Sequence, residues 1–253
     1  MSLETTKAVS AIVSGTLPKP DTVPTVSNYP INLFSLFSRS HEAVGFETVT
    51  ELCPETICRS PLNFRVGALV SDLSVLFTHM VAPDSYRKRL SSVADRWTGF
   101  QDPGRDSQKY LLGPHRARYF QDFQDLIPNK TGASLRCIHI LLPHVPYQYL
   151  PDGRLYSVDS SLSNWGDDEV LAAQAYQRYL LQVGFTDRIL GQFLERLQEI
   201  GIYDDALIVV TADHGASFEP GDVRRSLQKR SLAESLGVPL FIKKPRQTRG
   251  RGV

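Results

Sequence analysis

A chain of 253 residues, 42% of them hydrophobic, is long enough to bury the core of one large domain and is not expected to be disordered as a whole. The 28 basic and 27 acidic residues leave a formal charge of +1, which excludes a strong overall attraction to nucleic acid or to an anionic membrane. The sequence lacks both the apolar run of roughly 20 residues that a membrane-spanning helix needs and the pattern of a signal peptide, so we expect the chain as given to be soluble.

Short helices and extended segments are predicted for the N-terminal part. Residues 5–15 carry small and apolar residues at helical spacing and end at Gly15, a typical C-terminal cap. Four prolines in the next segment predict an extended or turning chain. Asn32 is a predicted N-cap for a short helix, and residues 43–49 favour a strand.

The middle of the chain has fewer clear signals. Apolar residues three and four positions apart predict a helix over residues 66–81. The segment from residue 83 to about residue 128 is rich in Arg, Asp, Tyr and Phe, and we expect helices and loops that cover one face or form a lid. Residues 135–142, LRCIHILL, are typical of a strand that is buried on both faces of a parallel sheet.

A strand–helix–strand pattern follows in the last third. Asp167 and Asp168 open a predicted long amphipathic helix that ends near Gly201. A second buried strand begins at Ala206 and a third at Val238. Strand, helix and strand joined by short links indicate a right-handed parallel crossover. The predicted fold class is therefore α/β, with a mostly parallel sheet flanked by helices.

The three cysteines are too few for a disulfide scaffold. Cys53 and Cys58 are close enough to pair if a turn brings them together, and two free thiols are the alternative. Cys137 lies in an apolar run and is expected in the core. The same strand contains His139, which we also expect to be a packing residue.

Reactive side chains follow two of the predicted strands. Asp213 and His214 come directly after the strand that begins at Ala206, and His144 follows residues 135–142. Ligands bind beyond the carboxyl ends of parallel strands, and an adjacent carboxylate and imidazole suit zinc, manganese or a similar cation. Two alternatives stay open: a polar pair that only caps the strand, and a general acid or base that works without metal.

The segment GIYDDALIVVTADHG, together with the amphipathic helix before it, resembles the C-terminal metal-binding motif of sulfatases and of the phosphate-ester enzymes in the alkaline phosphatase superfamily. The resemblance implies an alkaline phosphatase-like three-layer sandwich. It also implies that Asp213 and His214 coordinate a catalytic divalent metal, which could be Mn, Zn, Mg or Ca.

A second resemblance concerns the N-terminal helix. The superfamily places its nucleophile ten positions before the Gly that ends this helix, and counting back from Gly15 gives Thr5. The resemblance implies that Thr5 is the nucleophile and a metal ligand, and that Lys7 helps to hold the anion; an ordinary N-cap is the alternative for Thr5. True sulfatases use a Cys or Ser that becomes formylglycine, so Thr favours the phosphodiesterase and phosphoglycerol transferase branch.

Substrate contacts are expected from two further segments. His144, in PHVPYQYLPDG, resembles the His-containing loop that these families place at the substrate, where it donates a proton or binds an anionic oxygen. Arg224 and Arg225 follow the Asp-His pair by a short loop and are candidates to bind the anionic group. The alternatives are a surface histidine and a solvated basic face.

The family's first strand, which carries acidic metal ligands, has no counterpart before Thr5, and relatives continue beyond the last predicted strand. We therefore expect a fragment with an incomplete metal site, that lacks the first strand and the C-terminal part and is open to dimerisation across the gap. We divide it into a leader of residues 1–4, the α/β domain of residues 5–245 and a basic tail of residues 246–253.

The functional expectation from the resemblance is a metal-dependent hydrolase or transferase of sulfate or phosphate esters. Its substrate would be a small-molecule or lipid-linked ester, with no role for nucleic acid. Relatives of this type are often tethered on the extracytoplasmic side of a membrane, which implies that location for the full-length protein. The rival hypothesis is a catalytically inactive domain of the same fold that serves binding or scaffolding.

Overall fold

The computed structural model describes residues 4–18, 22–58, 73–74, 77–78, 80–83, 116–127, 132–157, 165–222, 224–225 and 227–250. In chain order its elements are α1 (Thr5–Ser14), α2 (Leu33–Phe37), β1 (Glu42–Phe46), α6 (Arg116–Asp125), β2 (Ser134–Ile138), α7 (Glu169–Glu199), β3 (Ile208–Thr211), α8 (Leu232–Leu236) and β4 (Leu240–Lys243). The predicted helix over residues 66–81 and the predicted lid lie largely outside the described residues, apart from α6.

Three predicted helix ends are confirmed by their caps. Gly15 has a positive φ of 67° after α1, and its N–H donates to Ala11 O at 2.8 Å. Asn32 caps α2 in a reciprocal pair of hydrogen bonds with Ser35. The Asp168 side chain accepts the first free N–H groups of α7, and this helix runs for 31 residues. Each of these ends was signalled by a residue type whose local chemistry stops or starts a helix.

Helices cover both faces of the parallel pair β1–β2. Ala43 pairs with Leu135 and Gly45 with Cys137, and this set of side chains packs with α1 and α2 around the buried Phe34. The alternate residues Phe46 and Ile138 pack on the other face, against α6 and α7. This alternation is the period of two that a strand imposes. The α/β class is therefore confirmed, whereas the superfamily's complete sandwich stays a prediction.

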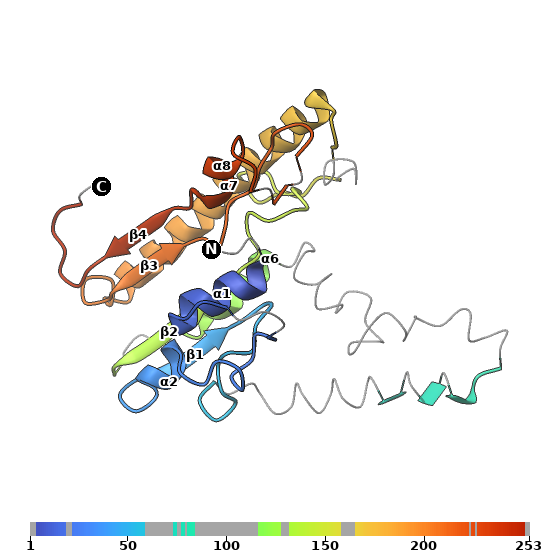
Figure 1. Cartoon of the computed structure of the whole chain (residues 1–253). Helices are drawn as coiled ribbons and strands as arrows, with labels where there is room; N and C mark the ends of the chain where they lie inside the picture. Colours follow the sequence, from blue (N-terminus) through green and yellow to red (C-terminus); the bar gives the residue numbers. More distant parts are fainter. Residues whose placement is uncertain are drawn as a thin grey trace.

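The second strand pair corrects the predicted topology. β4 runs antiparallel to β3, with Val209 opposite Ile242, and within the described residues no ladder joins β2 to β3, so the predicted parallel crossover is not seen. The segment that links β3 to β4 returns to the edge from which β3 leaves, because Gly215 N–H donates to Ser235 O at 2.8 Å. A strand that starts at that edge has to run back along its neighbour. Figure 1 shows α7 alongside this pair.

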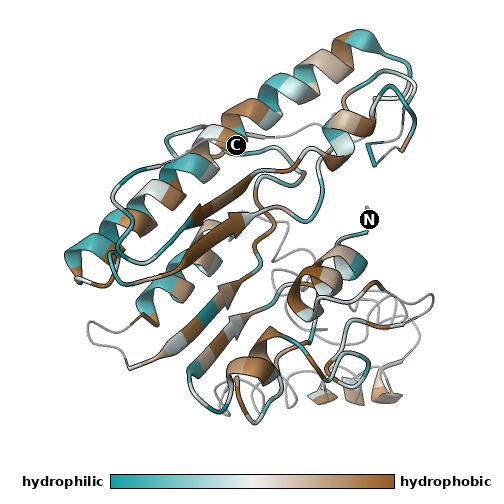
Figure 2. Ribbon diagram, turned by 60° about the vertical axis from the view of Figure 1, so that its left-hand side comes forward, coloured by the Kyte–Doolittle hydropathy of each residue, from teal (hydrophilic) through white to brown (hydrophobic). Residues whose placement is uncertain are grey.

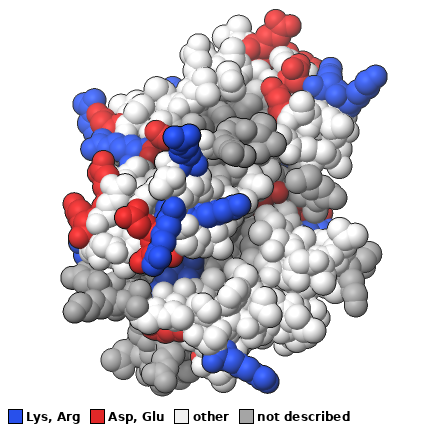
Figure 3. All heavy atoms as spheres, turned by 90° about the vertical axis from the view of Figure 1, so that its left-hand side faces the viewer, with Lys and Arg blue, Asp and Glu red and all other residues white. Residues whose placement is uncertain are grey.

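The strands β3 and β4 are less buried than their apolar sequences predict. Val209 is 55% exposed, and Leu240 and Phe241 are 62% and 63% exposed. Figure 2 shows both strands in the colour of hydrophobic residues. Within the described part of the chain, no helix is long and apolar enough to cross a membrane. Figure 3 shows basic and acidic side chains interspersed on the face in view, which agrees with the small net charge.

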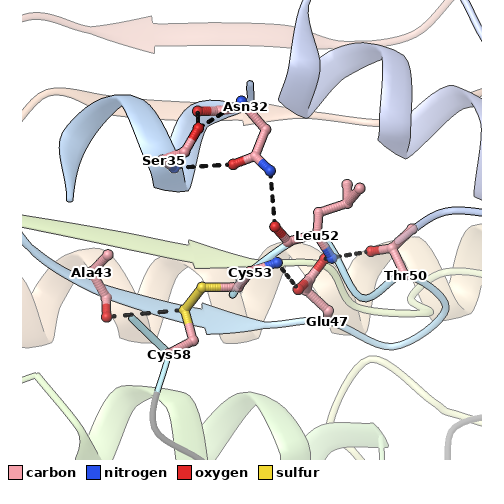
Figure 4. The surroundings of a disulfide bond; sticks show 8 residues. All are labelled: Asn32, Ser35, Ala43, Glu47, Thr50, Leu52, Cys53 and Cys58. Carbon is pink, nitrogen blue, oxygen red and sulfur yellow. Dashed lines mark hydrogen bonds between the residues drawn. A yellow bond between two sulfur atoms is a disulfide. The ribbon is translucent and has the colours of Figure 1, made fainter. Parts of the chain in front are cut away.

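A disulfide and a carboxylate organise the loop that follows β1. Cys53 and Cys58 form a disulfide, which decides the alternative that the sequence left open. Next to it, Glu47 accepts hydrogen bonds from the Thr50 hydroxyl at 2.6 Å, from Leu52 N–H at 2.9 Å and from Cys53 N–H at 2.8 Å (Figure 4). Asn32 Nδ2 donates to Leu52 O at 2.9 Å and ties this loop to the start of α2. Both carboxylate oxygens of Glu47 thus accept hydrogen bonds from this loop.

We expect Glu47→Gln to lower the free energy of unfolding by about 1–2 kcal/mol. The amide nitrogen would face either the Cys53 N–H or the pair formed by the Thr50 hydroxyl and the Leu52 N–H, and the negative charge that strengthens these hydrogen bonds would be lost. Urea unfolding of the two proteins measures the difference. Glu51→Gln, at an exposed carboxylate in the same loop, is the matched control. Equal unfolding curves for Glu47→Gln and the parent protein would show that the carboxylate does not hold the loop.

Candidate active site

The Thr5 hydroxyl lies in the site and does not cap the helix. Glu4 occupies the N-cap position of α1, and Thr5 is the first helical residue. Thr5 is only 9% exposed, and its Oγ1 lies 3.2 Å from His214 Nε2. An N–H of Arg225 donates to the same oxygen at 3.3 Å. The N-cap alternative is therefore wrong. Figure 1 accordingly shows the N-terminal end of α1 beside the end of β3.

Asp213 and His214 present their donor atoms to one point at the end of β3. His214 Nδ1 lies 2.7 Å from Gly215 O and donates its proton there, so Nε2 keeps its lone pair when the ring is neutral. Asp213 Oδ2 lies 3.4 Å from this Nε2. The same Oδ2 is buried, and within the described residues it has no hydrogen-bond partner. A buried carboxylate oxygen without a hydrogen bond is costly unless a further positive group approaches it.

This geometry fits a cation better than a catalytic triad. In a triad the carboxylate accepts from the imidazole nitrogen that faces away from the nucleophile. Here Asp213 and Thr5 both lie at Nε2 of His214, and a backbone carbonyl occupies Nδ1. Carboxylate, imidazole and hydroxyl donors that converge in this way are typical metal ligands. Among the described residues, however, no group of three or more His, Cys, Asp or Glu side chains has metal-binding geometry.

His144 reaches the same site from the loop after β2. Its Nδ1 donates to Val145 O at 2.7 Å, and its Nε2 accepts from an Arg225 N–H at 3.2 Å. Arg225 thus bridges His144 and Thr5. The pKa of His144 is lowered to about 4, mainly by burial. The hydrogen bond to Val145 opposes this shift, and the nearby Arg224, Arg225 and Arg116 contribute to it. The ring is therefore neutral near pH 7 in the absence of a bound anion.

The two basic residues also differ in their surroundings. Burial is the main cause that lowers the pKa of Arg225, and the positive charge of Arg224 also lowers it. The carboxylates of Asp213 and Glu4 raise it. Arg224 is at the edge of the site, where its charge reaches both His144 and Tyr147. The structure therefore brings the two arginines of the sequence prediction to the site, with Arg225 in contact with its central residues.

Lys7 lies two positions after Thr5 on α1 and forms an ion pair. Its ammonium lies 2.9 Å from the Glu4 carboxylate, three positions earlier in the chain, and this pair is largely solvent-exposed. The turn of α1 separates position 7 from position 5 by about 200° around the helix axis. Lys7 thus pairs with the Glu4 carboxylate, and its role in holding the anion stays a prediction.

Sequence reasoning missed three polar residues that support the site. His139, expected to be a packing residue, is half-buried and hydrogen-bonds through Nδ1 to the Thr48 hydroxyl. Burial lowers the pKa of His139, and Asp213 is the main opposing charge, so this ring lies near the site. Arg116 and Gln182 bind the backbone of the loop that carries His144. No local pattern marks these residues, because their partners are distant in sequence.

We expect His144 to make the fold sensitive to acid. The unfolded chain binds a proton at this ring below about pH 6.5, whereas the folded chain binds it only near pH 4, so folding stability is lost as the pH falls through this window. The loss amounts to at most about 3 kcal/mol. His144→Gln removes this contribution, so the decline in unfolding free energy from pH 7 to pH 4 becomes smaller. Urea unfolding at several pH values measures it.

The matched control for this prediction is His41→Gln, at a histidine outside the site. The control should decline with pH as the parent protein does. If His144→Gln also follows the parent protein at every pH, the buried neutral state of His144 is contradicted.

Comparisons with known proteins agree with this geometry. The Sulfatase family model matches residues 77–251, a range that includes His144, Asp213, His214 and Arg225 but not Thr5. An ulvan-active sulfatase from Formosa agariphila is 27% identical over 124 residues. That alignment covers 47% of this chain and 24% of the relative, so the chain spans about a quarter of the relative's length. Since the family model covers more than half of its residues, the chain belongs to the sulfatase family, within the sulfatase and alkaline phosphatase-like superfamily.

Proposed function

We propose that this chain provides the catalytic centre of a divalent-metal-dependent hydrolase or transferase of phosphate or sulfate esters, with Thr5 as the nucleophile. The observation that carries the proposal is the position of the Thr5 hydroxyl. It is buried between His214 Nε2 at 3.2 Å and the Arg225 guanidinium at 3.3 Å. A nucleophilic oxygen, a candidate metal ligand and an anion-binding group thereby meet at one atom.

The metal would be held by Asp213, His214 and Thr5. Asp213 Oδ2 is the buried oxygen without a hydrogen bond, and His214 offers a nitrogen lone pair. When bound, a divalent cation such as Mn, Zn, Mg or Ca lowers the pKa of the hydroxyl and withdraws charge from the ester. Asp213 is the single carboxylate of this set, and among the described residues no group of three or more His, Cys, Asp or Glu side chains has metal-binding geometry, which supports weak metal binding by these residues.

The reaction follows from the atoms that surround Thr5. The Thr5 hydroxyl gives its proton to solvent, and the ionised Oγ1 attacks the phosphorus or sulfur while the bond to the leaving oxygen breaks. Arg225 donates N–H groups to the non-bridging oxygens. An anion bound beside Nε2 of His144 offsets the positive charges around this ring and raises the His144 pKa, so that the ring can carry the proton that the leaving oxygen takes. Water or an acceptor alcohol then removes the group from Thr5.

The side chain at position 5 favours phosphate over sulfate esters. A threonine cannot be converted to formylglycine, whereas a threonine hydroxyl can form a phosphoester directly. Phosphodiester hydrolysis, or transfer of phosphoglycerol or phosphoethanolamine from a small or lipid-linked donor, is therefore the leading proposal. Sulfate-ester hydrolysis is the second candidate. The family match and the similarity to an ulvan-active sulfatase favour it.

The Cys53–Cys58 disulfide supports an extracytoplasmic location for the full-length protein, since such bonds persist mainly in oxidising compartments. We propose that the full-length protein is tethered to a membrane there, and that its partner is a small-molecule or lipid-linked phosphate or sulfate ester and not nucleic acid. We also propose that the protein can form oligomers. A catalytically inactive binding domain would not need a reactive hydroxyl in contact with Arg225 and His214, so the burial of Thr5 supports the enzyme.

The test is hydrolysis of p-nitrophenyl phosphate, bis-p-nitrophenyl phosphate and p-nitrophenyl sulfate by the full-length protein, with manganese, zinc, magnesium or calcium added in turn. We expect metal-dependent turnover that Thr5→Ala lowers by at least about 1,000-fold, because the nucleophile is lost. Asp213→Ala should lose the response to metal. Thr5→Ser keeps a hydroxyl and should keep measurable turnover.

Thr6→Ala is the matched control, because it removes a hydroxyl from the next position of the same helix. Its turnover should equal that of the parent protein. Turnover that survives Thr5→Ala, or that no chelator reduces, would contradict the proposed mechanism. The substrate that is hydrolysed fastest decides between phosphate and sulfate esters.

A further inference from the structure

His144 lies in a loop whose backbone is not part of a helix or a strand. β2 ends at Ile138, although the apolar sequence continues to Leu142. The chain from residue 141 to residue 148 lies outside helices and strands, and Tyr149 then forms an isolated bridge with Leu155. Backbone carbonyl and N–H groups in such a segment need partners from elsewhere when they are buried. Leu141, Leu142, Tyr147 and Tyr149 in this loop are all less than 9% exposed. Two side chains from other elements provide partners for several of these groups.

Arg116, the first residue of α6, is one of them. It is 1% exposed, and its guanidinium donates to Leu141 O at 2.9 Å, to His144 O at 2.5 Å and to Pro146 O at 2.7 Å. The same group lies 5.3 Å from the centre of the Tyr149 ring. A planar guanidinium can satisfy several carbonyl groups at fixed angles, which a lysine ammonium cannot reproduce.

Gln182, in the middle of α7, is the other. It is fully buried, and its Nε2 donates to Pro143 O at 3.0 Å and to His144 O at 2.8 Å. Its Oε1 accepts from Gln148 N–H at 2.9 Å and from Tyr149 N–H at 3.3 Å. The amide therefore connects both sides of the loop, and the two side chains meet at the same carbonyl, that of His144.

The orientation of the His144 ring follows from this backbone. Nδ1 of His144 donates to the carbonyl of the next residue, Val145, at 2.7 Å, so the direction of Nε2 toward Arg225 depends on the path of the loop. A charged guanidinium is an expensive group to bury: burial lowers the pKa of Arg116 to about 10. An apolar side chain would fill the same space at lower cost but would leave the loop carbonyls without donors.

We propose that Arg116 and Gln182 are positioning residues that fix the loop of residues 141–149 and thereby aim His144 at Arg225 and the substrate. This inference rests on the proposed function, in which His144 acts beside Thr5. Neither residue touches the reacting atoms; both act through His144. Their loss should affect the chemical step more than substrate binding, because Arg225 and Thr5 are held by other elements.

The test uses Arg116→Lys and Gln182→Leu in the full-length protein, each alone and combined with His144→Ala. We expect kcat to fall by about 10- to 100-fold with less than about a 3-fold change in KM, the loss that a misplaced group causes. In the His144→Ala background the same substitutions should change kcat by less than about 2-fold, because residues that act through one group are not additive. Arg118→Lys on α6 and Gln174→Leu on α7, both at exposed positions, are the controls.

A second readout does not need turnover. Diethyl pyrocarbonate modifies a free imidazole nitrogen, and His144 Nε2 is engaged by Arg225 in the native site. Peptide mass mapping should show slow modification of His144 in the parent protein and the controls, and at least about 5-fold faster modification when the loop is released. Gln182→Met keeps the length of the side chain and removes the N–H donors without adding a charge, so it replaces Gln182→Leu if that variant does not fold.

Unchanged reactivity of His144 in both variants would overturn the proposal. Fully additive losses of kcat with His144→Ala would overturn it as well, because they indicate a general structural role. If no ester is hydrolysed by the parent protein, the proposed function fails, whereas faster modification of His144 would still show that the two residues hold the loop.

Discussion

The contact between the Thr5 hydroxyl and the His214 imidazole joins residues that are 209 positions apart, and the remaining features of the site depend on it. It requires α1 to begin where β3 ends, so that the first turn of a helix faces the carboxyl end of a strand. A helix N-terminus has unpaired backbone N–H groups that favour an anion, and ligands in α/β proteins bind beyond the carboxyl ends of strands. Arg225 extends this contact to His144, so that three separate segments converge on one atom.

The same local hydrogen bond orients both His144 and His214. His144 and His214 each donate Nδ1–H to the carbonyl of the following residue at 2.7 Å, which directs Nε2 inward. The direction of each ring is therefore fixed by local backbone. The two nitrogens nevertheless face different groups: His214 faces Asp213 and Thr5, as a metal ligand would, and His144 faces a guanidinium. Identical side chains are thus suited to different chemistry by their neighbours.

Much of the fold and of the candidate site could be predicted from the local chemistry of single residues and short segments. Gly15 and Asp168 mark helix ends through their own backbone or side-chain chemistry, and a reactive pair after an apolar strand marks a site in any α/β sheet. Long-range pairing carries no such signal. The antiparallel direction of β4 follows from the Gly215–Ser235 hydrogen bond, and Arg116 binds carbonyl groups 25 to 30 residues away. Neither is visible in the periodicity of the sequence.

The proposed mechanism requires that Thr5 forms a covalent ester with the group it transfers. Its most direct test is to mix the full-length protein with substrate and metal, quench with acid within the first turnovers, and map the mass of the peptide that contains Thr5. We predict that this peptide gains the mass of one phosphoryl or sulfuryl group, and that the gain disappears in Thr5→Ala. An active protein in which Thr5 never carries the group, even under rapid quenching, would contradict the account.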